Sequence, residues 1–380
     1  MNILFLNISS PNPLLGGVPC VAFYLYKYFK SKGHNVTVLA WKKTATDYDG
    51  NPDYVFMPDK DKVLSDANRE MIDNVLERMN IDVVMNHTCL TPKYSDTLKY
   101  LKSHNLHVVS VVHNSPFGMY GLRTNLQNFG TKHIRKVLDW MTKQFFRLKY
   151  HKQWNQVTEY SDRVVMLSDK FIPEYQYFAG KKYPERMTSM PNPLTVEDEP
   201  RVEKQNRLVF VGRLVKEKGL NYLLDIWRLL EAKYPDWQLD IVGDGDERVF
   251  VENRIKELRL RHCNMYGFQK PEPFYNQAKI FCMTSIFEGF GLVLIEAMHF
   301  GTVPFAFRSY ANVGDIIEDG KSGFLITPFD VRQYADKLSS LMDNPEILNA
   351  MSKQAEVKSE DFSLESIGGK WEKLFGEIVL

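Results

Sequence analysis

Residues 208–219 read Leu-Val-Phe-Val-Gly-Arg-Leu-Val-Lys-Glu-Lys-Gly, and this stretch decides the fold. The apolar run from Leu208 to Gly212 predicts a buried β-strand. Apolar residues then recur at helical spacing and predict a helix with one buried face: Leu220, Leu223, Leu224, Trp227 and Leu230. A continuous apolar strand followed by an amphipathic helix is the repeating unit of a parallel sheet covered on both faces.

The same unit recurs in two series along the 380 residues, which are too many for one ordinary core. The first series of predicted strands is Ile3–Asn7, Val36–Trp41, Asp82–Met85, Val108–Val112 and Val164–Leu167. The second series is Leu208–Gly212, Leu239–Gly243, Ile280–Met283 and Val303–Ala306. We therefore predict two Rossmann-like α/β domains, residues 1–195 and 196–364, joined by the proline-rich, charged segment 191–200. Ligands of open α/β sheets bind beyond the carboxyl ends of the strands, so the cleft between the domains is the predicted site.

The composition is that of a soluble globular protein, with 44% hydrophobic and 25% charged residues. A net charge of +1 gives no overall attraction for nucleic acid. The first residues lack a signal peptide's basic flank, and no apolar run reaches the ~18 residues of a membrane span. The four scattered cysteines lack zinc-site spacing and are expected to be reduced. We therefore expect a cytoplasmic protein.

Two cations frame the turn after the Leu208–Gly212 strand. Arg213 stands at its carboxyl end, and Lys218 stands at the start of the predicted helix. Two cations beside a helix N-terminus oppose its dipole, an arrangement that suits a bound anion. Arginine can fork onto phosphate oxygens while lysine acts as a point charge. Two solvated surface cations would leave the same pattern.

A second polar stretch, residues 285–297, holds Glu288 and Glu296 within an apolar run. Gly289 and Gly291 free the backbone before a predicted helix over Leu292–His299. The helix N-terminus would offer an anionic or polyhydroxyl ligand three backbone amides, those of Phe290, Gly291 and Leu292. The alternative is a tight turn with one solvated and one capping glutamate.

Further glycine turns follow predicted strands. Gly243 begins a Gly-Asp-Gly turn, but Arg248 stands where a dinucleotide fingerprint needs its third glycine. The acids of this turn, Asp244 and Asp246, suit a turn better than a metal site, so no metal is predicted. Gly16 and Gly17 precede a helix predicted from Pro19 to about Lys32 and would let backbone amides approach a ligand, although a plain turn is equally compatible.

His113 ends the Val108–Val112 strand at the edge facing the predicted cleft, where it is either a functional residue or a satisfied structural histidine. Residues 123–152 are dense in cations, with Asp139 as the only acid, and carry apolar residues at helical spacing. This segment predicts either a basic amphipathic helix on an anionic membrane surface or a helix packed on the first sheet with a solvated basic face.

Taken together, these segments resemble the retaining family-4 glycosyltransferases of GT-B fold over nearly the whole chain. The resemblance rests on the Gly16-Gly17 turn, on Val-Gly-Arg-Leu through Lys218-Gly219, on the Val-Gly-Asp-Gly turn at Gly243, and on Glu288-Gly-Phe-Gly through Glu296. It implies two Rossmann-like domains facing each other across a cleft. It also implies a last helix, about residues 365–380, that packs back on the first domain.

The resemblance also implies roles for these residues. Arg213 and Lys218 would hold the diphosphate of a nucleotide-sugar, Glu288 with the amides of Phe290, Gly291 and Leu292 the transferred sugar, and Glu296 the ribose. Gly243, Gly267 and Phe268 would border the nucleotide, and Gly16, Gly17 and His113 would face the donor from the first domain. Arg213, Lys218, Glu288 and His113 would be catalytic, with no metal and no cofactor besides the substrate.

The expected reaction moves a sugar from a nucleotide-sugar, a UDP-sugar before GDP-mannose, to a hydroxyl of a glycan or lipid-linked saccharide in cell-surface polysaccharide synthesis. The segment 123–152 would contact the inner face of the membrane. Asn114 replaces the commoner acid after the histidine, which argues against a general-base role for that pair. The alternatives are a nucleotide-sugar epimerase of GT-B layout and a non-catalytic binding subunit.

Overall fold

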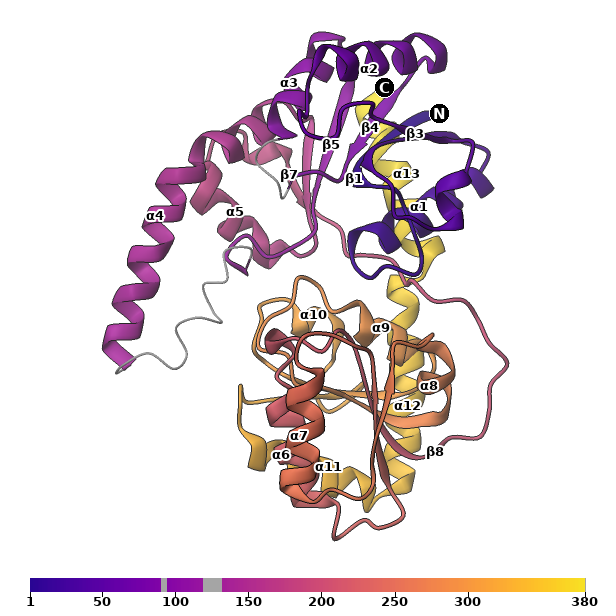
Figure 1. The fold of residues 1–380 in the computed structure, drawn as a ribbon, viewed down its shortest axis with the longest axis vertical. Helices are drawn as coiled ribbons and strands as arrows, with labels where there is room; N and C mark the ends of the chain where they lie inside the picture. Colours follow the sequence, from indigo (N-terminus) through magenta and orange to yellow (C-terminus); the bar gives the residue numbers. More distant parts are fainter. Residues whose placement is uncertain (90–93, 119–131, 380) are drawn as a thin grey trace. The chain divides into compact units, whose positions relative to one another are not determined.

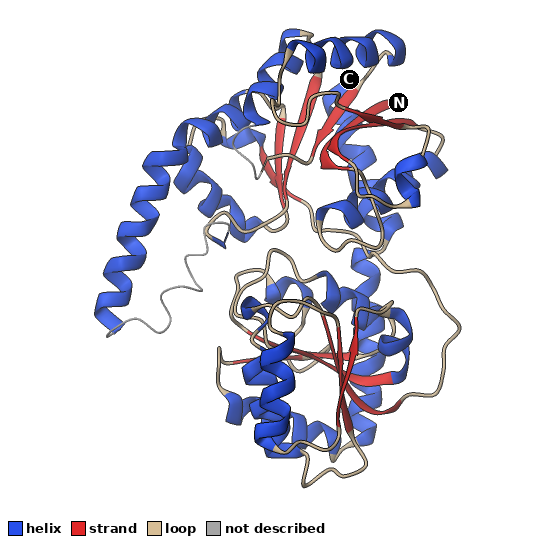
Figure 2. Ribbon diagram, viewed as in Figure 1, coloured by secondary structure: helices blue, strands red, loops and turns tan. Residues whose placement is uncertain are grey.

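The computed structural model describes residues 1–89, 94–118 and 132–379. Contacts divide the chain into two compact units. Unit 1 comprises Met1–Thr195 and Leu364–Leu380, and unit 2 comprises Val196–Ser363. In each unit the strands gather in the middle and helices flank them (Figure 2), which is the covered parallel sheet that the apolar strand runs predict.

The sheet of unit 1 has the strand order β3-β2-β1-β4-β5-β6-β7, and its strand pairs are parallel. Its strands are β1 (Asn2–Ser9), β2 (Asn35–Lys42), β3 (Tyr54–Phe56), β4 (Val83–Asn86), β5 (His107–Val112), β6 (Arg163–Met166) and β7 (Met187–Ser189). Its helices are α1 (Val18–Ser31), α2 (Asp66–Met79), α3 (Ser95–Ser103), α4 (Lys132–Glu159), α5 (Ile172–Ala179) and α13 (Leu364–Val379).

The C-terminal helix α13 packs on α1, although more than 330 residues separate them (Figure 1). The rings of Phe29 and Phe375 pack against each other in a tilted arrangement, with centroids 5.6 Å apart. Glu372 accepts hydrogen bonds from the Tyr28 hydroxyl at 2.9 Å and from the His34 ring at 2.7 Å. Through these contacts, α13 packs as part of unit 1.

The sheet of unit 2 has the order β10-β9-β8-β11-β12-β13 and is also parallel. Its strands are β8 (Gln205–Val211), β9 (Gln238–Val242), β10 (Cys263–Gly267), β11 (Ala278–Met283), β12 (Val303–Phe307) and β13 (Phe324–Ile326). Its helices are α6 (Leu220–Leu230), α7 (Arg248–Leu258), α8 (Glu272–Gln277), α9 (Leu292–His299), α10 (Val313–Ile316), α11 (Val331–Met342) and α12 (Pro345–Ser359).

The predicted strands are all present, and the predicted apolar face of α6 is buried in the core of unit 2. The fold is that of two Rossmann-like α/β domains, as predicted. Four strands were not predicted from the sequence: β3, β7, β10 and β13, of which three have only three residues. Two helix starts differ slightly: α1 begins at Val18 rather than Pro19, and α6 begins at Leu220, after a 3₁₀ turn that contains Lys218.

Helix α4 packs on α3, α5 and β6 through its C-terminal part, where Trp154 and Val157 are buried, but much of the apolar surface of its N-terminal part is exposed. Five apolar side chains spaced one, three or four residues apart are between 55% and 82% exposed: Val137, Trp140, Met141, Phe145 and Leu148. Residues 123–131 of the predicted basic segment, with Arg123, lie outside the described residues, as do the side chains of residues 132–136. No helix in the described part of the chain combines the length and the apolar character needed to cross a membrane.

Candidate functional site

The predicted donor-site residues of unit 2 follow four neighbouring strands. Arg213 follows β8, Gly243 follows β9, Gly267 ends β10, and Glu288 lies in the loop after β11. The strand order is β10-β9-β8-β11 and the strands are parallel, so all four carboxyl ends lie at one edge of the sheet. The topology thus brings together residues that are up to 75 positions apart in the sequence.

Backbone hydrogen bonds tie these turns to one another. The amide of Gly212 donates to Val242 O at 3.0 Å, the amide of Gly243 donates to Gly267 O at 2.7 Å, and the amide of Leu214 donates to Asp244 O at 2.9 Å. On the other side, the amide of Ile286 donates to Glu217 O at 2.7 Å. The edge is therefore a connected backbone scaffold rather than a set of independent loops.

Lys218 and Glu288 form an ion pair at this edge. Lys218 Nζ lies 2.5 Å from Glu288 Oε1, and the same oxygen accepts a hydrogen bond from Ser285 Oγ at 2.7 Å. The two side chains are only 17% and 14% exposed, so the pair is partly shielded from solvent. Glu288 Oε2 makes no hydrogen bond to any residue that the structure describes, which leaves one carboxylate oxygen available to a ligand.

The turn that carries Lys218 is fixed by Gly219 and Thr284. Gly219 has φ 62°, and a Cβ there would lie 2.2 Å from the Thr284 carbonyl oxygen. Thr284 Oγ1 in turn donates to the carbonyl of Lys218 at 3.0 Å. A glycine is required here because the β8 and β11 turns touch backbone to backbone.

Arg213 differs from Lys218 in being exposed and without an ion-pair partner among the described residues. It follows Gly212 at the carboxyl end of β8, five residues before Lys218. Arg213 thus offers a guanidinium that is not committed to an ion pair among the described residues, at the same sheet edge as the Lys218–Glu288 pair. This arrangement can receive an anion without first breaking an existing ion pair.

Helix α9 begins at Leu292, as predicted, directly after Gly291 in the left-handed conformation at φ 98°. A Cβ at Gly291 would lie 2.8 Å from the Tyr310 hydroxyl, so this position also favours glycine. Phe290 is buried and its ring meets that of Phe362 edge-on at 6.0 Å. Glu296 is 8% exposed and accepts a hydrogen bond from the Tyr275 hydroxyl at 3.1 Å, so its carboxylate is held inside the domain.

Close backbone packing requires a glycine at position 243, whether or not this turn binds a ligand. A Cβ there would lie 1.9 Å from the Gly212 carbonyl oxygen. Asp244, in the same turn, binds Arg248 at 2.8 Å. No group of three potential metal-ligating side chains occurs within residues 1–89, 94–118 and 132–379. Phe268, after β10, is 71% exposed.

The predicted residues of unit 1 lie at the carboxyl ends of its own strands. Gly16 and Gly17 are exposed, and Gly17 precedes α1 with φ 74° and no atom within 4 Å of a Cβ placed on it. His113 directly follows β5 and is 7% exposed. Its Nε2 atom lies 2.7 Å from Nδ1 of His87, a residue that was not predicted as part of the site.

Three further contact residues were missed: Ser285, Thr284 and His87. Ser285 stands three residues before Glu288, a spacing that could have suggested its hydrogen bond. His87 follows the predicted Asp82–Met85 strand and could have been found by asking which polar residues end neighbouring strands. No local signal marks Thr284, whose contact depends on the pairing of β8 with β11.

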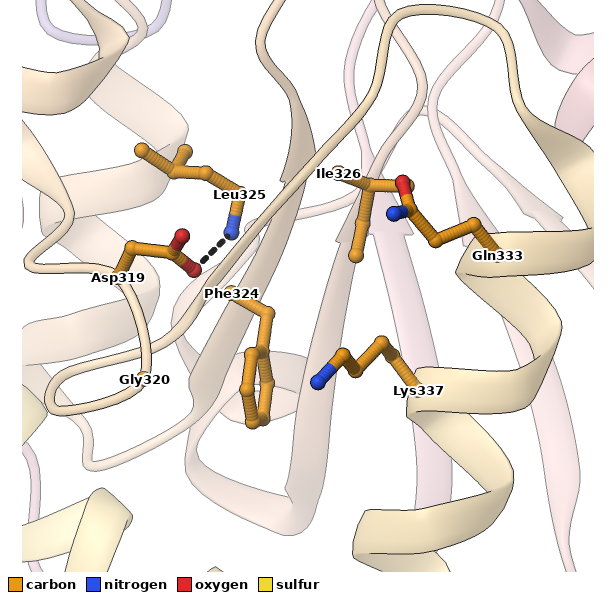
Figure 3. Close-up of a pocket in the computed structure, with 7 residues that line it drawn as sticks. All are labelled: Asp319, Gly320, Phe324, Leu325, Ile326, Gln333 and Lys337. Atoms are coloured by element: carbon orange, nitrogen blue, oxygen red, sulfur yellow. Dashed lines mark hydrogen bonds between the residues drawn. The ribbon is translucent and has the colours of Figure 1, made fainter.

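A separate small hollow of about 250 Å³ lies beside β13 and α11 (Figure 3). In it the amide of Leu325 donates to Asp319 at 2.9 Å, and the Lys337 ammonium lies 5.3 Å from the centre of the Phe324 ring. None of the predicted site residues lines this hollow.

Comparison with known proteins confirms the resemblance to glycosyltransferases. Residues 193–358 match the family model of glycosyl transferases group 1. An uncharacterised glycosyltransferase of Haemophilus influenzae is 32% identical over 219 residues, which cover 55% of this chain and 60% of that protein. A Campylobacter jejuni protein named as an α-1,4-N-acetyl-D-galactosaminyltransferase acting on an undecaprenol-linked saccharide is 27% identical over 52% of this chain and 56% of its own length. The chain therefore spans less than two thirds of these relatives.

Solved structures resemble the whole chain in fold. HepE of Anabaena in complex with UDP superimposes with a TM-score of 0.74 at 16% identity, covering 99% of this chain and 100% of HepE. TarM superimposes with a TM-score of 0.73 at 15% identity, with 99% of both chains covered. At these identities the likeness shows the GT-B fold alone.

Proposed function

We propose that this chain is a glycosyltransferase that moves a sugar from a nucleotide-sugar to a hydroxyl of a glycan or lipid-linked saccharide in the synthesis of a cell-surface polysaccharide or glycolipid. Unit 2 would bind the donor and unit 1 the acceptor. The match of residues 193–358 to glycosyl transferases group 1 supports this assignment for unit 2.

The observation that carries the proposal is the arrangement of Arg213, Lys218 and Glu288 at one sheet edge. Cleavage of a sugar–phosphate bond leaves negative charge on the diphosphate, and preorganised cations stabilise that charge in the transition state. Unpaired Arg213 would meet the diphosphate first, and Lys218 would share its charge between Glu288 and the phosphate. The free Oε2 of Glu288 can accept a hydrogen bond from a sugar hydroxyl.

The other predicted roles belong to the same proposal. The N-terminus of α9 would present the amides of Phe290, Gly291 and Leu292 to the sugar. Glu296 would bind the ribose, and Gly243, Gly267 and Phe268 would border the nucleotide. Gly16, Gly17 and His113 would contact the donor from unit 1. The reaction would retain the anomeric configuration and need no metal, as the resemblance to family-4 enzymes implies.

For the donor we propose a UDP-sugar before GDP-mannose, in keeping with the UDP bound to HepE. For the acceptor we propose a polysaccharide or lipid-linked saccharide. Several relatives carry names of this kind, including an amylovoran biosynthesis glycosyltransferase of Erwinia amylovora and the Campylobacter enzyme acting on an undecaprenol-linked saccharide.

Acceptor dependence separates this reaction from its alternatives. The purified chain is incubated with UDP-sugars or GDP-mannose, with and without saccharide acceptors and with EDTA. Nucleotide release that requires an acceptor, persists in EDTA and yields a product with the donor's anomeric configuration is expected. Nucleotide and an epimerised sugar without acceptor would indicate an epimerase, whereas donor binding without turnover across a broad acceptor set would indicate a binding subunit.

Helix α4 supports a further proposal, that unit 1 docks on the anionic inner face of a membrane where a lipid-linked acceptor resides. Its exposed stripe of Val137, Trp140, Met141, Phe145 and Leu148 suits the interfacial region of a bilayer. Exposed cations on the same helix, Arg147, Lys149 and Lys152, suit anionic headgroups. Asp139 is already paired with Lys143 at 2.7 Å, so it opposes this attraction little.

A further inference from the structure

Unit 1 contains a buried polar cluster at the carboxyl ends of β1, β4 and β5, formed by Asn7, His87 and His113. Leu6 pairs with Asn86, and Asn86 with Ser110. Side chains alternate along a strand, so Asn7, His87 and His113 belong to the sheet face opposite the Asn86–Ser110 hydrogen bond of 2.9 Å. The His87 ring lies 5.3 Å from that of Phe5, two residues before Asn7, as this alternation requires.

The two histidines make one hydrogen bond with each other. His87 Nδ1 and His113 Nε2 are 2.7 Å apart, and the ring planes differ by 23°. Between two neutral imidazoles, one proton must occupy this hydrogen bond. If it sits on His87 Nδ1, then His113 Nε2 is bare and His113 carries its proton on Nδ1. If it sits on His113 Nε2, both rings carry their protons on Nε2. The two histidines must therefore share one tautomer.

Burial keeps the pair neutral. It lowers the pKa of His113 to about 4, opposed in part by the nearby Asn192 side chain. Burial also lowers the pKa of His87 well below its usual value, and the neighbouring His113 adds to this effect. His87 Nε2 and the Asn7 amide have no hydrogen-bond partner among the described residues. The Asn192 side chain lies beside His113, but His113 Nδ1 makes no hydrogen bond of normal geometry with a described residue. In either tautomer the pair therefore ends in one donor nitrogen and one acceptor nitrogen that make no hydrogen bond of normal geometry with a described residue.

We propose that His87 is a positioning residue: it holds the ring of His113 and fixes it in the same tautomer as its own. His113 then presents one defined hydrogen-bonding group, through Nδ1, to a neutral polar ligand. The part played by His113 toward substrate rests on the function proposed above. The shared tautomer of the pair does not, because it follows from the contact alone.

Nitrogen-15 NMR of the ligand-free full chain, labelled at histidine, tests the pair directly. At pH 7 we expect His87 and His113 to be neutral and to show the same tautomer. The variants His87→Asn and His107→Asn help to assign the histidine signals, because each removes one histidine. His107 lies on β5, and its side chain is 41% exposed. Opposite tautomers, or a charged ring on either residue, would overturn the proposal, whether or not the chain proves to be a glycosyltransferase.

Turnover provides the second readout. His87→Phe removes the partner of His113 Nε2 and should lower kcat by roughly tenfold to a hundredfold with a smaller change in KM, because a misoriented group is lost from the reaction geometry. His87→Asn retains a polar atom near the Nδ1 position and should recover part of that loss, while His107→Asn should behave as the parent. Equal activity of the Phe and Asn variants would contradict a positioning role. A parent chain inactive with every donor but with matched tautomers would refute the proposed function and leave the pairing intact.

Discussion

Arg213 and Lys218, predicted together as diphosphate ligands, have different surroundings in the folded chain. Arg213 is exposed and lacks an ion-pair partner among the described residues, whereas Lys218 neutralises the partly buried Glu288. Loss of Arg213 should therefore affect the ligand alone, and loss of Lys218 should affect both ligand and fold. The spacing of the sequence suggested both cations, but it could not reveal this difference, because Glu288 is 70 positions from Lys218.

Arg213→Ala should lower kcat/KM about 100-fold or more, since one lost transition-state donor typically costs about 3 kcal/mol. Its free energy of unfolding should stay within about 0.5 kcal/mol of the parent. Steady-state kinetics and urea unfolding measure the two effects. Lys216→Ala, an exposed lysine of the same turn, is the matched control and should change neither. Near-parent turnover of Arg213→Ala would remove it from the site.

Lys218→Ala should lower turnover similarly and also destabilise unit 2 by about 1–3 kcal/mol, because Glu288 loses its charged partner. The double variant Lys218→Ala with Glu288→Gln should regain part of that stability without regaining activity. Urea unfolding of the single and double variants checks this. A single variant as stable as the parent would show that the ion pair does not contribute to stability.

Gly243 tests whether the turns of the sheet edge are held backbone to backbone. In Gly243→Ala the new Cβ would lie 1.9 Å from the Gly212 carbonyl oxygen, so we expect a loss of about 3 kcal/mol or more. Gly320→Ala is the control within unit 2: it has φ 77° but open space around the Cβ, so only about 1 kcal/mol should be lost. Equal urea midpoints for the two variants would contradict the packing explanation.

At the scale of elements, apolar runs were sufficient to predict the main strands, and the spacing and composition of apolar residues were sufficient to predict α6 and α9. Short strands such as β3 and β13 were not predicted, because three residues show no periodicity. Pairing with the neighbouring strand, rather than local sequence preference, forms these strands. Helix α4 was predicted as an element, but its surroundings were not. Its spacing predicted an amphipathic helix, but spacing cannot tell whether an apolar face packs on a sheet or remains exposed.

The exposed stripe of α4 leads to a prediction about membranes. The parent chain should float with vesicles containing anionic lipid and much less with neutral vesicles. The double variant Trp140→Ser with Phe145→Ser should reduce vesicle binding by about tenfold or more. Burial of each aromatic ring in the bilayer contributes about 1.5 kcal/mol or more to the free energy of binding. Leu229→Ser with Val249→Ser removes two exposed apolar side chains of unit 2 and should leave binding unchanged. Equal flotation with neutral and anionic vesicles would refute the docking surface.

At the scale of the whole molecule, the alternation of strands and helices was enough to predict two Rossmann-like domains. The candidate site was harder to predict from the sequence than the fold. Its residues could be named because each follows a strand, but their grouping depends on the order β10-β9-β8-β11, which places strands distant in sequence side by side. The His87–His113 contact has the same origin, because the adjacency of β4 and β5 creates it.

The central claim is that the edge carrying Arg213, Lys218 and Glu288 binds a nucleotide-sugar. Its most direct test is thermal unfolding of the parent chain and of Arg213→Ala with UDP-, GDP- and ADP-sugars. A ligand at about 100 times its Kd stabilises the native state by about 2.7 kcal/mol, so one nucleotide series, expected to be UDP, should raise the parent's Tm by several degrees. The Arg213→Ala variant should lose most of that increase. No increase in the parent with any nucleotide-sugar, or an equal increase in the variant, would contradict the account.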